Sequence, residues 1–275
     1  MSPSRPFPKD PPPPVEPTPS LLPPTQEQWD KLSPTEREEV QGALLAAQED
    51  FDSTYAQPES DHHYDAKEDI RRTLRDFFDG GDRGVYIGAE RAVFYPGEPG
   101  FTPDLIIVVD VPTYKRDCWM VSAEGRGPDV IIELHYKGKW KKDFVDNVRR
   151  FARLGIPEYY VFDVGRQILT AYHLPPSGGA YEQVRLGRVH SRRLGLELVV
   201  RRGRLHFSYR GALLPNNDER FAALTETLEQ EQARAEHEAA RAEQEAARAE
   251  QEAARAEQEA TRAEQEAARA EHEAA

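Results

Sequence analysis

Short apolar runs between residues 84 and 210 predict a β-rich segment. The runs are three to seven residues long, rich in Val, Ile, Tyr and Phe, and bounded by turn residues. They are Val85–Ile87, Ala92–Tyr95, Leu105–Val111, Val130–Tyr136, Tyr159–Asp163, Ile168–His173, Leu196–Val200 and Leu205–Tyr209. The last two flank Arg202-Gly203, which predicts a hairpin turn.

Helical spacing of apolar residues predicts two helices, one just before this segment and one within it. Tyr64–Phe78 has Ile70, Leu74 and Phe77 on one face and ends at Gly80-Gly81. Trp140–Leu154 carries Phe144, Val148, Phe151 and Leu154 at i, i+4, i+7 and i+10. Because strand, helix and strand follow one another across 130–163, we predict a mixed β-sheet core flanked by helices, an α/β (α+β) fold.

The segments before and after this domain differ from it in composition and sequence pattern. Residues 1–26 hold 11 of the 22 prolines and predict a disordered arm, a tether or a PxxP ligand. Residues 27–63 predict a helix capped at Ser33 and reaching Gln48, followed by a linker over 49–62. His62-His63 is interpreted as a helix-start pair, because adjacent side chains point apart. The β-rich domain is assigned to 64–210 and a connector to 211–228.

Residues 229–275 repeat Ala-Arg-Ala-Glu-Gln-Glu-Ala with a period of seven. Helix propensity and Glu–Arg pairs predict a long helix. Its apolar seam is alanine, which buries little surface, so two interpretations remain open. The segment is either a single solvated helix or a coiled-coil arm for self-association or a partner helix.

Charge separates these segments further. The formal net charge is −13, yet residues 64–210 carry 25 basic and 20 acidic side chains. The acidity lies in the flanking segments, so the β-rich domain permits a nucleic-acid partner. A single cysteine, Cys118, excludes a disulfide framework, and no apolar run is long enough for a membrane span. With no apolar signal region at the N-terminus, we expect a cytoplasmic protein without a membrane partner.

Candidate chemistry lies on two of the apolar strands. Asp104 begins one of them, and Glu133 is embedded in the other. Asp129, Glu133, His135 and Lys137 share parity, so a regular strand points them to one face. Because a buried carboxylate needs a partner, Asp104 and Glu133 predict a site for a hard divalent cation. The alternative is that they mark strand ends or pair with Arg149 or Arg150.

Basic residues occur near these carboxylates and again towards the end of the domain. Lys137, Lys139, Lys141 and Lys142 are four of the chain's eight lysines. Arginines dominate 185–210 and include Arg192, Arg193, Arg201 and Arg202. Either these residues contact a phosphate backbone, or they cover a solvated strand face.

Several motifs together resemble the Uma-two family of predicted restriction endonucleases, within the PD-(D/E)XK nuclease superfamily. The resemblance covers roughly residues 27–210. It rests on Phe101-Thr-Pro-Asp104, Pro128-Asp-Val-Ile-Ile-Glu133, Phe151-Ala-Arg-Leu-Gly155-Ile-Pro-Glu-Tyr159, Tyr160-Val-Phe-Asp163 and Gly195-Leu-Glu-Leu198.

The resemblance implies a restriction-endonuclease-like fold and phosphodiester hydrolysis in nucleic acid, DNA in the first place. It implies Mg²⁺, or Mn²⁺ in its place, held by Asp104 and Glu133. The superfamily's lysine position is His135 here, and the lysine that many members place on the next helix is Asn147. Lys137 is therefore the first candidate for the catalytic lysine and Lys142 the second, with His135 as a weak acid or base.

These departures leave the function open between an active endonuclease and a catalytically silent relative. The silent relative would bind nucleic acid or a protein and use its helical tail as an interaction arm. A scaffold whose tail oligomerises is a third possibility.

Overall fold

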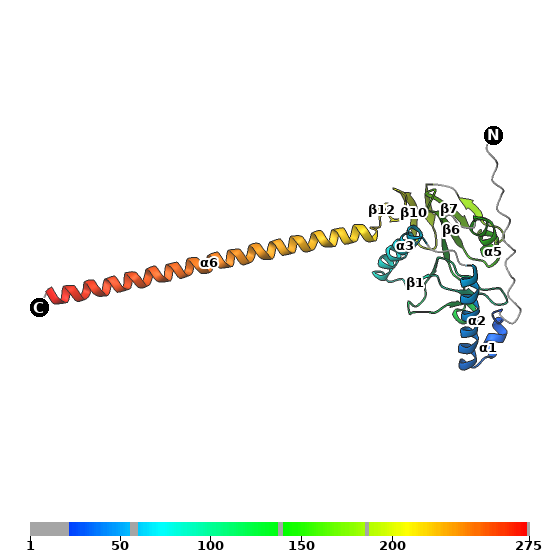
Figure 1. Ribbon diagram of the computed structural model, residues 1–275, viewed down its shortest axis with the longest axis horizontal. Helices are drawn as coiled ribbons and strands as arrows, with labels where there is room; N and C mark the ends of the chain where they lie inside the picture. Colours follow the sequence, from blue (N-terminus) through cyan, green and yellow to red (C-terminus); the bar gives the residue numbers. More distant parts are fainter. Residues whose placement is uncertain (1–21, 56–59, 137–139, 185–186, 274–275) are drawn as a thin grey trace, which may run out of the picture. The chain divides into compact units, whose positions relative to one another are not determined.

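The computed structural model describes residues 22–55, 60–136, 140–184 and 187–273. Its contacts divide the chain into two compact units, Met1–Asn217 and Asp218–Ala275. Figure 1 shows the first unit as a mixed α/β domain and the second as part of one long helix. Within the described residues, no helix is long and apolar enough to cross a membrane.

A six-stranded mixed sheet forms the centre of the first unit. Its spatial order is β1-β3-β5-β6-β7-β8, and only β5 and β6 run parallel. The strands are β1 (Val85–Ala89), β3 (Leu105–Val109), β5 (Val130–His135), β6 (Glu158–Asp163), β7 (Ile168–His173) and β8 (Glu182–Val184). The parallel β5–β6 pair requires the crossover helix that the sequence predicts between them.

Both faces of this sheet are covered, which explains why β3 and β5 are apolar almost throughout. Ile106 and Ile131 lie on the face that packs against Phe151 of α5 (Asn147–Arg153). Leu105 and Ile132 lie on the opposite face with Leu74 of α3 (Asp61–Asp79). α3 begins three residues before its predicted start, with Ser60 as its N-cap.

The second sheet has the order β12-β11-β10-β9 and packs on the α3 side of the core. Its strands are β9 (Arg188–Ser191), β10 (Leu196–Arg201), β11 (Arg204–Tyr209) and β12 (Ala212–Leu213). The hairpin predicted at Arg202-Gly203 is confirmed, because both residues have positive φ, +49° and +79°. β8 and β9 are absent from the predicted strands because they carry few apolar residues, and β12 because it is only two residues long.

Glu158 links the two sheets. This buried carboxylate accepts hydrogen bonds from the backbone N–H groups of Arg192 and Arg193 at 2.8 and 3.1 Å. The hydroxyls of Tyr160 and Ser191 also donate to it. The glutamate of the Gly-Ile-Pro-Glu-Tyr motif therefore anchors the turn after β9 to the central sheet.

The N-terminal helices pack beside a small two-stranded sheet. The helices are α1 (Gln26–Lys31) and α2 (Pro34–Tyr55), and the strands are β2 (Val93–Phe94) and β4 (Trp119–Met120). Trp29 of α1 and Leu44 of α2 form an apolar cluster with residues of β2 and β4. The short α4 (Val121–Glu124) follows β4 directly. Neither α1, β4 nor α4 was predicted. α2 extends seven residues past Gln48, so the predicted linker over 49–62 is wrong for residues 49–55.

The predicted helix 140–154 contains an irregular turn. Residues Lys142–Asp146 form a π-helix, η2, that leads into α5, and the N–H of Asn147 donates to the carbonyl oxygen of Lys142. A π-turn inside a helix is a feature that occurs frequently at functional sites.

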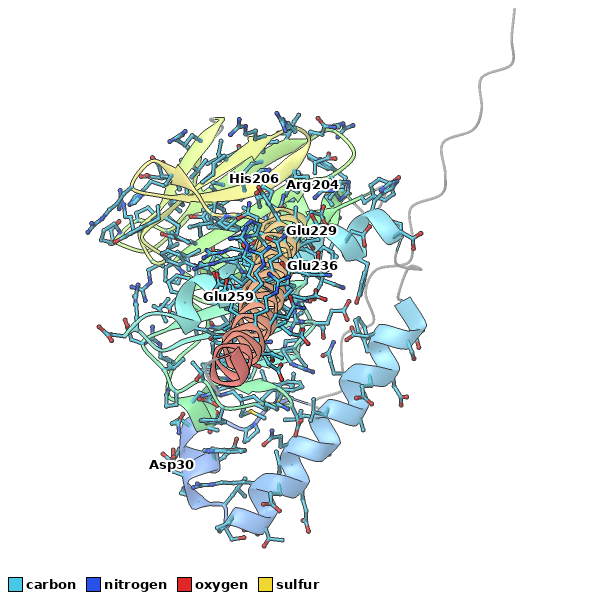
Figure 2. All side chains as sticks on the ribbon, turned by 90° about the vertical axis from the view of Figure 1, so that its left-hand side faces the viewer. Asp30, Arg204, His206, Glu229, Glu236 and Glu259 are labelled. Atoms are coloured by element: carbon cyan, nitrogen blue, oxygen red, sulfur yellow. The ribbon has the colours of Figure 1, made fainter. Side chains whose placement is uncertain are left out.

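The long helix α6 runs from Asn217 to Glu273 and begins inside the segment assigned as a connector. Its side chains are exposed from Phe221 as far as residue 263. Figure 2 labels Glu229, Glu236 and Glu259 among the many acidic side chains along it. Pairs such as Arg241–Glu245, at 3.4 Å, confirm the predicted i, i+4 contacts.

Candidate active site

Asp104 and Glu133 meet at the adjoining ends of β3 and β5. Leu105 pairs with Ile132, which places Asp104 opposite Glu133. The Asp104 N–H donates to Glu133 Oε2 at 3.3 Å, and the Leu134 N–H donates to Asp104 Oδ2 at 2.7 Å. The two carboxylates that the sequence analysis selected are therefore direct neighbours.

α3 adds a histidine to this pair. His63 Nε2 lies 3.2 Å from Asp104 Oδ2. The sequence predicted for His63 only a place at the start of a helix. Ser60 does cap α3 at this point. Its contact with Asp104 spans 41 residues of sequence, so no local pattern could reveal it.

The two carboxylates have opposite electrostatic settings. Glu133 is only 4% exposed, and burial, with Asp104 as a neighbouring acid, raises its pKa well above the ordinary value. Burial acts in the same direction on Asp104, but the contacts with His63 and the Leu134 N–H outweigh it and lower the pKa of Asp104. Asp104 therefore ionises more readily than Glu133.

A cavity of about 110 Å³ opens beside Glu133. It is lined by Phe51, Asp52, Gly100, Phe101, Thr102, Glu133, Lys142, Asn147, Arg150 and Phe151. The Asn147 side-chain amide donates to Glu133 Oε1 at 3.3 Å. The negative charge of Glu133 raises the pKa of Lys142, so this ammonium stays charged next to the buried carboxyl group.

The π-turn explains how Lys142 reaches the cavity. In a regular α-helix a turn takes 3.6 residues, so side chains five positions apart point in different directions. The wider turn pairs residue i with residue i+5, and Lys142 and Asn147 both line the cavity. A lysine that helical periodicity would place elsewhere thus lies on the same side as Asn147.

His135 is engaged with a different acid. Its Nδ1 lies 2.8 Å from Asp143 Oδ2, and both side chains are buried. Burial raises the pKa of Asp143, while Lys142 and His135 counteract this effect. The Tyr159 hydroxyl donates to the Asp143 carbonyl oxygen at 2.9 Å, which ties η2 to β6. His135 thus sits two residues beyond Glu133 with a partner of its own.

The remaining predicted residues are distributed over several places. Lys137 and Lys139 lie outside the described residues, and Lys141 is exposed at the start of η2. Arg192 and Arg193 lie in the turn after β9, where Arg193 contacts Asp129 at the opposite end of β5 from His135. Arg201 and Arg202 are exposed at the β10–β11 hairpin. Arg150 donates to the carbonyl oxygens of Pro99 and Gly100.

The donor set suits a hard cation that keeps most of its water. In the described part of the chain, no group of three or more His, Cys, Asp and Glu side chains is arranged to hold a metal ion. Mg²⁺ typically binds to one or two protein carboxylates and retains several waters. Adjacent carboxylates on two strands, with a cavity beside one of them, fit that requirement.

A mixed sheet that presents paired acids and a lysine beside a cavity has the features of a nuclease-like domain. Residues 50–203 match the Uma2 family, described as "Putative restriction endonuclease". The match spans more than half of the chain, and the chain belongs to this family.

A comparison with solved structures finds one titled as a putative nuclease belonging to DUF820 from Anabaena variabilis ATCC 29413. Its sequence is 13% identical to this chain. The aligned region covers 49% of this chain and 73% of the solved chain, with a TM-score of 0.39. No curated protein matches the chain.

Proposed function

We propose that this chain is a Mg²⁺-dependent endonuclease that hydrolyses phosphodiester bonds in DNA, with Mn²⁺ as an alternative cation. The observation that carries the proposal is the pairing of Asp104 with Glu133 beside the charged ammonium of Lys142. Membership of a family described by endonuclease activity supports the same reaction. The positive balance of residues 64–210 suits a polyanionic substrate.

Asp104 and Glu133 would hold the cation. When bound, the cation supplies Lewis-acid stabilisation of the phosphate and lowers the pKa of a water molecule. The His63 and Leu134 contacts keep Asp104 ionised and oriented. The Asn147 amide orients Glu133, and because burial raises the pKa of Glu133, a bound cation would favour its ionised form.

Lys142 is the lysine that the geometry favours. Its ammonium faces Glu133 at the cavity and would stabilise negative charge on the phosphate during hydrolysis. The family resemblance places the corresponding lysine at position 147, and the π-turn brings Lys142 to the side of Asn147. Lys137 remains a prediction from the sequence, because it lies outside the described residues.

Cleavage of supercoiled plasmid DNA tests the proposal directly. Wild-type protein should cut in Mg²⁺ or Mn²⁺ and be inactive with a chelator. Asp104→Asn and Glu133→Gln should abolish cleavage while leaving the circular dichroism spectrum unchanged. Glu197→Gln is the matched control, since this acid lies on β10 and pairs with Arg188. Persistent cutting by both site variants would refute the assignment.

A second candidate is a catalytically silent member of the family that binds nucleic acid or a protein. Two residues favour it. A neutral Asn147 occupies the position where the family resemblance expects a lysine, and the His135 ring contacts Asp143. Isothermal titration separates the two functions. A folded protein that takes up neither Mg²⁺ nor Mn²⁺, with or without DNA, would support the silent relative.

The helix α6 would serve either function as an arm for self-association or for a partner helix. Sedimentation of the full chain, compared with a chain ending before residue 229, tests this role. A concentration-dependent increase in mass that requires residues 229–275 is the expected result.

A further inference from the structure

One tryptophan of this protein is open to solvent. Trp29 and Trp119 are buried, at 5% and 0% exposure, whereas Trp140 is 51% exposed. A single exposed indole is common on protein surfaces, so its neighbours decide whether it has a role. The position of Trp140, two residues before Lys142, suggests one.

The Trp140 ring is held in place from one side. It stacks on Phe144, with ring centroids 5.3 Å apart and an angle of 13° between the planes. Phe144 meets the ring of His135 edge-on at 5.4 Å and packs against the apolar cluster of α5. Because the stack is anchored in the core, a planar ligand could bind to Trp140 without ordering a mobile side chain.

The surroundings of Trp140 define the chemistry of that ligand. Lys141 and Lys142 follow directly in sequence, and Lys142 lines the cavity next to Glu133. A flat aromatic face beside lysines is the combination with which proteins bind single-stranded nucleic acid, one group stacking on a base and the others neutralising phosphates. In a duplex, bases are stacked on one another and their faces are covered.

We propose that Trp140 stacks against an unpaired base next to the cleaved phosphate, so that the substrate is single-stranded, or locally unpaired, at the site. This inference rests on the proposed function, because it places the reacting phosphate at Glu133 and Lys142. It adds a substrate class, unpaired DNA, and a residue that selects it.

Binding measured with a chelator present tests the stacking without any cleavage. The probes are an oligothymidylate strand and a blunt duplex of the same length, at fixed salt. The single strand should quench the fluorescence of Trp140, and the buried Trp29 and Trp119 should contribute a constant background. Trp140→Ala should weaken binding of the single strand by about 5- to 150-fold, and Trp140→Phe should retain most of it. Duplex affinity should stay unchanged in both variants.

Phe221→Ala provides the matched control, because Phe221 is an exposed aromatic on α6, at 72% exposure. It should leave both affinities unaltered. Equal losses for strand and duplex in Trp140→Ala, or no loss for either, would overturn the inference. The outcome is separable from the endonuclease proposal. Stacking that persists in the inactive Glu133→Gln protein supports both proposals. Stacking in a wild type that never cuts would support binding of unpaired DNA at Trp140 and refute its place beside a cleaved phosphate.

Discussion

The two ends of strand β5 each bury a carboxylate, and the contrast between them distinguishes a structural acid from a functional one. Asp129 is 2% exposed and receives the Val109 N–H at 2.9 Å together with the guanidinium groups of Arg126 and Arg193. Glu133 is 4% exposed and has an acid, Asp104, as its neighbour.

The difference lies in how the charge is compensated. At Asp129 two guanidinium groups contact one carboxylate, so its negative charge is more than compensated. At Glu133 the neighbouring acids Asp104 and Asp143 each contact a histidine, Lys142 contributes an ammonium, and a cavity lies alongside. A buried cluster with excess negative charge is costly unless a cation joins it. The crowding of acids beside a cavity, more than burial itself, sets the proposed site apart from Asp129.

Among changes that leave the paired acids in place, removal of Lys142 should have the largest effect. Lys142→Met should lower the cleavage rate by about 10²- to 10³-fold, because a preorganised cation at the phosphate is lost. Plasmid cleavage under single-turnover conditions measures it. Lys141→Met, next to it but not lining the cavity, should change the rate less than about threefold, by order of magnitude for a surface charge.

A double variant sharpens this result. Asn147→Lys, introduced into the Lys142→Met protein, returns an ammonium to the same side of the helix and should restore part of the activity. Recovery would show that the π-turn has moved the lysine's role from one position to the other. If Lys142→Met proves fully active, the lysine must be sought elsewhere, with Lys137 first.

At the structural end, Asp129→Asn should destabilise the fold by about 2–3 kcal/mol, since charged hydrogen bonds to two partly exposed arginines are lost. Urea unfolding followed by circular dichroism measures the change. Asp110→Asn is the matched control, since Asp110 is an exposed acid paired with Arg83. Its cost should stay below about 1 kcal/mol. Equal costs for the two variants would contradict the contrast drawn here.

Glu133→Gln should act in the opposite direction and stabilise the protein, by about 1 kcal/mol at neutral pH. The folded-state pKa of Glu133 is raised, so the wild type loses stability as pH rises from the ordinary value of 4.5 towards the folded-state pKa. Below pH 4.5 both side chains are neutral and the difference should vanish. Thermal melts across this pH range provide the measurement. A destabilised Glu133→Gln at neutral pH would show that the carboxylate is already compensated.

The smallest expected effect concerns the cation. Excess Mg²⁺ should raise the melting temperature of the wild type by a few degrees, because it binds the folded state only. Glu133→Gln should lose this increase, and Asp129→Asn should retain it. A Mg²⁺-dependent rise of equal size in all three proteins would place the ion somewhere other than the paired acids.

Much of the central sheet could be predicted from local pattern. β7 spans the predicted residues Ile168–His173, and the hairpin at Arg202-Gly203 forms as expected, because apolar runs and turn residues act locally. Asp104 and Glu133 were selected because a carboxylate beside or within a buried apolar run stands out. Short polar strands such as β8 have no such signal, and their pairing to β7 depends on the sheet already present.

The site itself depended on contacts between distant residues. His63 of α3 contacts Asp104, and Lys142 lines the cavity because of a π-turn, which the spacing of apolar residues does not predict. Asp129 shows the converse, since its parity with Glu133 predicted only that the two side chains share a strand face. Its two arginine partners make it structural, and one of them, Arg193, comes from a turn 64 residues away.

The sequence alone determined the longer apolar strands, the charge partition, the repeat helix and the two acids, because these follow from neighbouring residues and from strand and helix periodicity. The tertiary structure decided which acid is compensated, which lysine faces it and which tryptophan is left open. Those outcomes depend on distances between segments far apart in the chain, and burial and charge act through space.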